Sequence, residues 1–183
     1  LIKAKDKEWD IKILPQVWGN TPWGFLDKQD PLRTRFIQGQ MTSKPDIWMQ
    51  ITIPNEFQPI GQFNIGVTAG IESTCPPPDF IEGMNRMDLN LVSSEFTKNT
   101  FKNIQLTQND KQGQPVKQFK LEKPIEVLFE GLDTGIYFKE PGKSGLLDNI
   151  DESFCFLFTG HWLPGSFGED RKNVATMIKT FLK

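Results

Sequence analysis

The chain has 183 residues, of which 37% are hydrophobic, 11% aromatic and 24% charged, and its formal net charge is −2 at pH 7. This length suits one domain, or one domain plus part of another, and the composition excludes a disordered chain. Because the net charge is small and the lysines are spread along the chain, we expect no nucleic-acid partner.

Two cysteines, Cys75 and Cys155, lie far apart, and neither belongs to a C-x-x-C or Cys/His grouping. The sequence therefore predicts neither a disulfide framework nor a zinc site, and favours a reducing compartment. No apolar run approaches the roughly 20 residues of a membrane span, and the N-terminus lacks the apolar core of a signal peptide. We expect a cytoplasmic protein without a transmembrane segment. Since the chain begins with Leu1, we also expect processing or a natural start further upstream.

The first predicted strand is Trp9–Leu14, where apolar and polar residues alternate before Pro15. It follows a lysine-rich helix end at Ile2–Lys7, so it is not expected to be the first strand of the fold. Residues 15–31 are rich in proline, glycine and aromatic residues, which predicts a long loop. Such a loop is either functional or a packed surface loop.

The segment Asp46–Pro54 is apolar on both parities except at Gln50, as in a parallel strand covered by helices on both faces. Phe63–Ala69 repeats this pattern. Three prolines, at positions 76–78, predict the first turn of a helix that runs to about Met87. Its buried stripe is predicted at helical spacing, on Phe80, Met84 and Met87.

Leu89–Val92 is predicted as a short strand, and Ser93 or Ser94 as the N-cap of a helix through Phe101. The tract from Asn64 to Phe96 thus predicts consecutive β-α-β-α units. In open sheets of this kind, ligands bind at the carboxyl ends of the strands. The candidate functional loops are therefore 68–74 and 92–95.

Residues 103–123 are polar and predict a connector around Gly113, and residues 125–129 predict a buried strand. Asp133 is expected to fix the following turn through its side chain. The acidic, glycine-containing segment 139–153 is the candidate domain boundary. Beyond it we predict a strand at Phe154–Phe158, and a helix that Asp170 can cap. The buried positions expected in that helix are Val174, Met177, Ile178 and Phe181.

Three tracts together, Asp79–Phe101, Ile125–Phe138 and Phe154–Phe181, resemble segments of GT-B glycosyltransferases in the retaining group that includes glycosyltransferase family four. The resemblance implies an α/β fold with a Rossmann-like open parallel sheet and helices on both faces. It also implies an acceptor-side domain at residues 1–139 whose first strand is missing, and a linker at residues 140–153. Residues 154–183 would then be the first β-α unit of a nucleotide-sugar domain, so the second domain is only partly present.

The same resemblance implies transfer of a sugar from a nucleotide-sugar donor to a carbohydrate or other hydroxyl acceptor in the interdomain cleft. No cofactor and no essential metal are expected, in agreement with the lack of a D-x-D tract. The chain alone is expected to be inactive, as part of a longer enzyme. The alternative is a noncatalytic glycosyltransferase-like module for carbohydrate binding or assembly. A third possibility is an unrelated Rossmann-like domain, although no G-x-G-x-x-G or P-loop run occurs.

On the donor side, the resemblance makes Gly160 the close-approach glycine and Lys172 the lysine that binds the donor phosphate. Arg171 and Lys172, at a helix start with free backbone N–H groups, would suit a pyrophosphate. The competing interpretation is a solvated helix terminus. His161 stands where relatives often have arginine, and it is either a donor contact or, as a lone histidine, structural.

On the acceptor side, Glu72, Ser73 and Thr74 follow a predicted strand at its carboxyl end. They are candidate acceptor-binding residues. The competing interpretation is loop capping, with Ser73 or Thr74 starting the next helix. A further polar group, Asn85, Arg86 and Asp88, is expected to hold the helix against the sheet.

Overall fold

The computed structural model describes residues 8–16, 26–71, 73–139, 145, 149–160, 168–170 and 172–182. The chain divides into two compact units, Leu1–Gly131 and Leu132–Lys183. The predicted linker, residues 140–153, falls within the second unit, and most of it lies outside the described residues.

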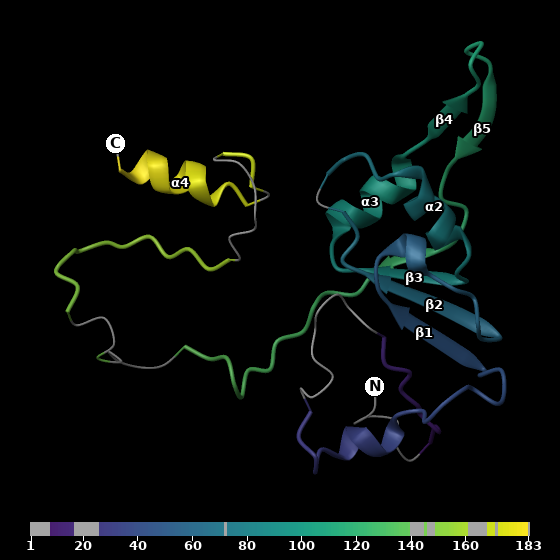
Figure 1. Cartoon of the computed structure of the whole chain (residues 1–183), viewed down its shortest axis with the longest axis horizontal. Helices are drawn as coiled ribbons and strands as arrows, with labels where there is room; N and C mark the ends of the chain where they lie inside the picture. The colour runs from purple at the N-terminus through teal and green to yellow at the C-terminus, as the bar shows by residue number, and fades with distance from the viewer. Residues whose placement is uncertain are drawn as a thin grey trace. The chain divides into compact units, whose positions relative to one another are not determined.

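The first unit is built on a four-stranded parallel sheet with the order β1-β2-β3-β6 (Figure 1). Its strands are β1 (Ile47–Ile51), β2 (Phe63–Thr68), β3 (Leu89–Val92) and β6 (Ile125–Val127). Register pairs Met49 with Ile65, and Val67 with Leu91. The predicted α/β class and the predicted parallel sheet are therefore confirmed.

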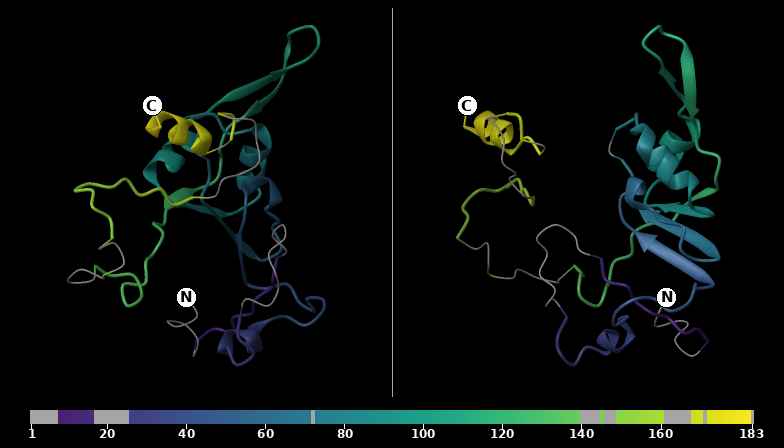
Figure 2. Two further views of the ribbon diagram at one scale, coloured as in Figure 1. Left: turned by 60° about the vertical axis from the view of Figure 1, so that its left-hand side comes forward. Right: turned by 45° about the vertical axis from the view of Figure 1, so that its right-hand side comes forward.

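Helices α2 (Pro78–Asn85) and α3 (Glu95–Asn103) and the 3-10 turn η2 (Pro54–Glu56) join these strands. All three pack on one face of the sheet, where they enclose one hydrophobic core (Figures 1 and 2). Its fully buried members include Phe57, Ile81, Met84, Val92 and Phe101. Within the described residues of the first unit, helices cover one face of the sheet and not both as predicted. Along the chain, each strand of this sheet pairs with the preceding strand of the same sheet, so right-handed crossovers place every connection on the same face.

On strands β1, β2 and β3, the opposite face of the sheet carries aliphatic and aromatic side chains, and on β6 the register places Glu126 on that face. On its outermost strand, Ile47, Met49 and Ile51 remain 46%, 38% and 67% exposed, and Phe63 at the start of β2 is 44% exposed. Strand β1, predicted to be buried on both faces, is therefore exposed on one face and half-buried on the other.

Ahead of the sheet, the 3-10 turn η1 (Pro31–Arg35) begins after Asp30, whose carboxylate accepts the Leu32 N–H at 2.8 Å. The predicted strand Trp9–Leu14 is wrong, because its only ladder contact is an isolated bridge from Ile13 to Phe36. Apolar and polar residues do alternate in this segment, but no described strand pairs with it over more than one residue pair.

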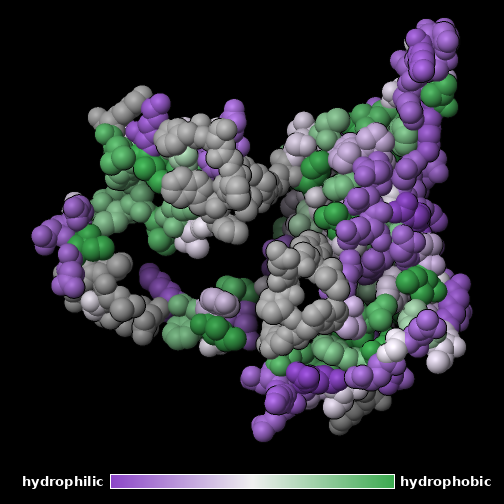
Figure 3. All heavy atoms as spheres, in the orientation of Figure 1, coloured by the Kyte–Doolittle hydropathy of each residue, from purple (hydrophilic) through white to green (hydrophobic). Residues whose placement is uncertain are grey.

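A β-hairpin is inserted between α3 and β6, where the sequence predicted a connector. Its strands are β4 (Leu106–Asn109) and β5 (Pro115–Phe119). Its base is anchored because Phe119 is 8% exposed in the core, whereas residues 107–118 are exposed throughout. The turn is held by Asp110, whose Oδ1 accepts the N–H groups of Gln112 and Gln114. The projecting part is mostly hydrophilic (Figure 3).

The second unit contains helix α4 (Val174–Phe181). The predicted strand Phe154–Phe158 is wrong, since no described residue pairs with it in a ladder. Instead, Phe154 packs edge-on against Phe156 with ring centroids 4.9 Å apart, and Phe156 packs against Phe181 at 5.9 Å. The aromatic contacts thus link this extended segment to α4.

Candidate functional site

The carboxyl ends of the parallel strands all lie at one edge of the sheet, which is where a ligand is expected. Strand β1 leads into Thr52, β2 into Ala69, and β3 into Ser93. The structure therefore brings together the two loops that the sequence singled out, and adds the loop after β1.

The loop after β2 is fixed against the first turn of α3. The Thr97 hydroxyl donates to the carbonyl of Ala69 at 3.4 Å, and the Gly70 N–H donates to Thr68 Oγ1 at 3.1 Å. Gly70 has a φ of +82°, and a Cβ there would lie 2.1 Å from Thr97 Cγ2. Since Thr97 is only 2% exposed, glycine is required by both conformation and space.

Ser94 begins α3 as one of the two predicted caps. Its hydroxyl oxygen accepts the backbone N–H of Thr97 at 3.2 Å and donates to Thr97 Oγ1 at 3.1 Å. Ser94, Thr97 and the Ala69 carbonyl therefore form one chain of hydrogen bonds. This chain fixes the loop after β2 relative to the loop after β3.

A third polar group lies at the end of β1, and sequence reasoning missed it. The Thr52 hydroxyl donates a short hydrogen bond to Glu56 Oε2, and Gln16 Nε2 donates to the same oxygen at 3.1 Å. Thr52 is 4% exposed, whereas Glu56 is exposed. Because Gln16 and Glu56 are 40 positions apart in sequence, no local pattern indicates this contact.

Of the predicted acceptor-side residues, Glu72 lies outside the described residues. Ser73 and Thr74 are exposed in the loop between β2 and α2, and Ser73 Oγ donates to the Cys75 carbonyl at 3.4 Å. Neither one starts the next helix, since α2 begins at Pro78 after Pro77. Their position at the carboxyl edge agrees with the prediction, while contact with an acceptor stays a prediction.

On the donor side, Gly160 and Lys172 are described and exposed, whereas His161 and Arg171 lie outside the described residues. A Cβ at Gly160 would lie 2.6 Å from the ring of Phe158. The group that approaches this glycine closely is therefore an aromatic side chain, whereas the prediction was a donor phosphate. No contact between Gly160 and a phosphate follows from this arrangement.

The start of α4 differs from the predicted phosphate site. The carboxylate of Asp170 accepts the N–H groups of Val174 at 2.8 Å and Ala175 at 3.4 Å. Those two groups are therefore not free, and a buried negative charge stands where an anion would bind. Asp170 was correctly predicted as a cap; Asn173, which immediately precedes the helix, has a φ of 53° and makes no side-chain cap.

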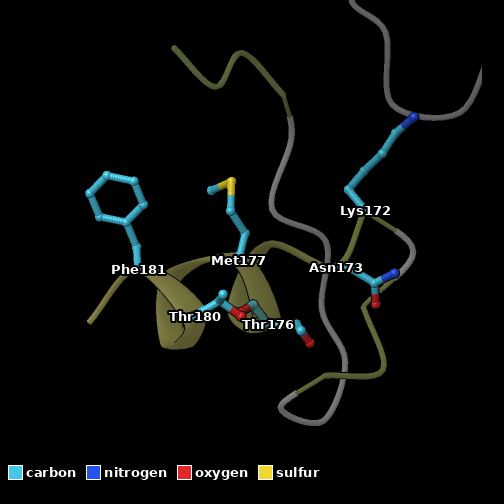
Figure 4. A pocket seen from close by; sticks show the side chains of 6 residues that line it. All are labelled: Lys172, Asn173, Thr176, Met177, Thr180 and Phe181. Atoms are coloured by element: carbon cyan, nitrogen blue, oxygen red, sulfur yellow. The ribbon is translucent and has the colours of Figure 1, made fainter. Parts of the chain in front are cut away.

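A surface depression of about 430 Å³ lies beside α4 (Figure 4). Its described lining comes from this one segment: Lys172, Asn173, Thr176, Met177, Thr180 and Phe181. Because a ligand site normally draws lining from several elements, this depression alone does not define one.

The polar residues Asn85, Arg86 and Asp88 make structural contacts, but each has its own partners, and they do not form the predicted single cluster between helix and sheet. Arg86 donates to the carbonyls of Phe57 at 2.8 Å and Asn55 at 2.7 Å, tying α2 to η2. Asp88 Oδ2 accepts both the backbone and the side-chain N–H of Asn64, at 2.9 and 3.0 Å. These hydrogen bonds from Asn64 lower the pKa of Asp88 below its ordinary value.

Asp133 also acts as predicted, since its Oδ1 accepts the Gly135 N–H at 2.9 Å. Throughout the described ranges, no cluster of three His, Cys, Asp or Glu side chains could hold a metal ion. Among the same residues, no helix has the length and apolar character needed to cross a membrane. Comparison of the chain with profiles of known protein families, with curated proteins and with solved structures gave no significant match.

Proposed function

We propose that this chain is the acceptor-side domain, with the start of the donor-side domain, of a retaining GT-B-type glycosyltransferase. The observation that supports it best is the β2-α2-β3-α3 succession, whose two loops are fixed together at the carboxyl edge of the sheet. This edge is where a parallel α/β sheet binds its ligand. The sequence resemblance supplies the reaction class.

In this proposal, Glu72, Ser73 and Thr74 contact a carbohydrate or other hydroxyl acceptor, and Gly160, His161, Arg171 and Lys172 contact the donor phosphates. Cationic side chains there would stabilise the departing nucleotide diphosphate as charge develops. No metal is required for this role. A cytoplasmic location belongs to the same proposal, and both described cysteines are free thiols.

The second candidate is a noncatalytic glycosyltransferase-like module that binds carbohydrate or serves in assembly. The position of Asp170 favours it. Because this carboxylate occupies two N–H groups at the start of α4, the helix offers a weaker site for a pyrophosphate than a free N-terminus would.

Titration calorimetry of the 183-residue chain with UDP, GDP and their sugar conjugates tests the proposal. Lys172→Ala should weaken diphosphate binding about tenfold, whereas Lys179→Ala, further along the same helix, should leave it unchanged. Circular dichroism should show equal helix content in both variants. Equal diphosphate affinities in the two variants would show that Lys172 does not bind the donor phosphates.

The noncatalytic candidate is separated by a second measurement. A chain that binds an immobilised glycan but none of the nucleotides would favour that candidate. Nucleotide binding together with an intact mass of the natural protein well above 21.0 kDa would favour the enzyme.

A further inference from the structure

Strand β1 has an unpaired edge without the usual protection. Within the described ladders it pairs only with β2, and its sequence, IWMQI, has no charge, proline or glycine. An apolar, regular edge strand of this kind is a template for pairing with another strand.

The other strand edges are protected. On β5, Pro115 and Lys117 disfavour the addition of a further strand, and the β4–β5 register shifts at Gln108/Asn109. Strand β6 has only three residues, and its Glu126 is bonded to Lys98 at 2.6 Å. By contrast, the side chains of β1 on the open face are exposed, with Ile51 at 67%.

We propose that β1 pairs with β1 of a second copy of this chain, antiparallel across a two-fold axis at Met49. Such an interface is isologous, so its surface must be complementary to itself. With Met49 opposite its copy, Ile47 lies opposite Ile51, and Trp48 lies opposite Gln50. Apolar side chains therefore meet apolar side chains on the open face, which is the favourable cross-strand pairing.

The flanking charges also permit this register. Asp46 lies opposite Thr52 of the second copy, so the two aspartates do not face each other. A pairing of β5 with its copy centred on Lys117 would instead bring two lysines together, which is unfavourable. The two sheets joined through β1 would form one continuous sheet of eight strands.

Sedimentation velocity of the 183-residue chain over a concentration series tests this proposal. We expect a dimer of twice 21.0 kDa, which Met49→Lys should weaken by tenfold or more because two like charges then meet at the axis. The matched control is Val116→Lys, on the projecting hairpin, where the native side chain is 60% exposed. Thermal unfolding should show that both variants fold.

Cross-linking gives an independent measurement. In a chain with Cys75→Ser and Cys155→Ser, Met49→Cys should form a disulfide dimer on mild oxidation. Opposed residues of antiparallel strands have Cα atoms about 4.5 to 5.5 Å apart, within disulfide range. Val116→Cys should stay monomeric. A monomeric parent chain, or a dimer that survives Met49→Lys and fails to cross-link at position 49, would overturn the proposal.

Discussion

The carboxylate of Asp170 accepts the backbone N–H of Val174 at 2.8 Å while the Asp170 side chain is almost fully buried. The first turn of α4 is thereby satisfied from within the chain. Helix stability and anion binding are in competition at this position, because the same N–H groups would serve both.

Asp170→Ala should therefore destabilise α4 by about 1 kcal/mol, as loss of a side-chain cap does. Hydrogen exchange of the Val174 and Ala175 amides should become faster. Asp170→Asn retains an acceptor oxygen and should therefore destabilise α4 less than Asp170→Ala does. The exposed neighbour Glu169, changed to alanine, is the control, and equal exchange in all variants would contradict the capping role.

Gly70→Ala should be more destabilising than Gly113→Ala, although both glycines have a φ of +82°. At Gly113 a new Cβ meets nothing within 4 Å, so only the backbone conformation costs about 1 kcal/mol. At Gly70 the Cβ also collides with Thr97, which adds about 1 to 3 kcal/mol. Urea unfolding of both variants measures the difference.

The collision between a Cβ at position 70 and Thr97 Cγ2 can be relieved without changing the backbone conformation at position 70. Thr97→Ser removes Cγ2 but keeps the hydroxyl, so Gly70→Ala combined with Thr97→Ser should recover part of the lost stability. If the double variant were no more stable than Gly70→Ala, the collision would not be the cause.

Gly83→Ala should destabilise the first unit even though alanine is the better helix former by about 1 kcal/mol. A Cβ at Gly83 would lie 1.8 Å from the carbonyl oxygen of Pro54, which is backbone and cannot rotate away. The expected net loss is about 2 kcal/mol or more, measured by urea unfolding. A stabilised variant would show that α2 and η2 are not packed this closely.

Asp88 should make stability depend on acid pH. Its pKa is lowered in the folded state by hydrogen bonds from Asn64, so its carboxylate stabilises the fold above the ordinary carboxyl value near 4. That contribution is lost as the pH falls from about 4 through the folded-state pKa. Asp88→Asn should lower stability at pH 7 and flatten this acid-side slope, whereas the exposed Glu130→Gln should change neither.

Asn85 should control order at the base of the hairpin. Its side chain donates to the Lys120 carbonyl and accepts the Glu122 N–H, each at 2.8 Å. Asn85→Ala leaves both groups without this partner and should cost about 1 kcal/mol, with faster exchange at the Glu122 amide. Asn85→Asp keeps the acceptor oxygen and should protect the Glu122 amide from exchange better than Asn85→Ala does. Asn99→Ala on α3 is the control.

The core strands and the cap of α3 could be predicted because their signals are local. Apolar runs end at turn residues in β2 and β3, and a serine stands immediately before α3. The hairpin β4–β5 could not be predicted, because most residues on both faces of its strands are exposed and its sequence has no alternation of apolar and polar residues. The opposite error occurred at Phe154–Phe158, where an apolar run predicts a strand but no described neighbour pairs with it.

For the candidate site, the sequence predicted which loops form it but not the side-chain contacts between them. Gly70 follows a strand, which indicates a turn, but its contact with Thr97 depends on how the loop packs against α3. Likewise, the hydrogen bonds that join Gln16 and Thr52 to Glu56 depend on the completed fold. The relative positions of side chains far apart in sequence are set by packing, which a single sequence does not display.

The sequential order β1-β2-β3-β6 has a kinetic consequence. The connections between the first three strands, residues 52–62 and 69–88, are shorter than the connection from β3 to β6, residues 93–124. The first three strands can therefore associate earlier than β6, whose pairing with β3 also depends on α3 and the hairpin. Closing this longer loop costs conformational entropy that rises only slowly with its length. Replacing the exposed part of the hairpin by a tight turn should therefore speed refolding slightly while leaving the unfolding rate nearly unchanged.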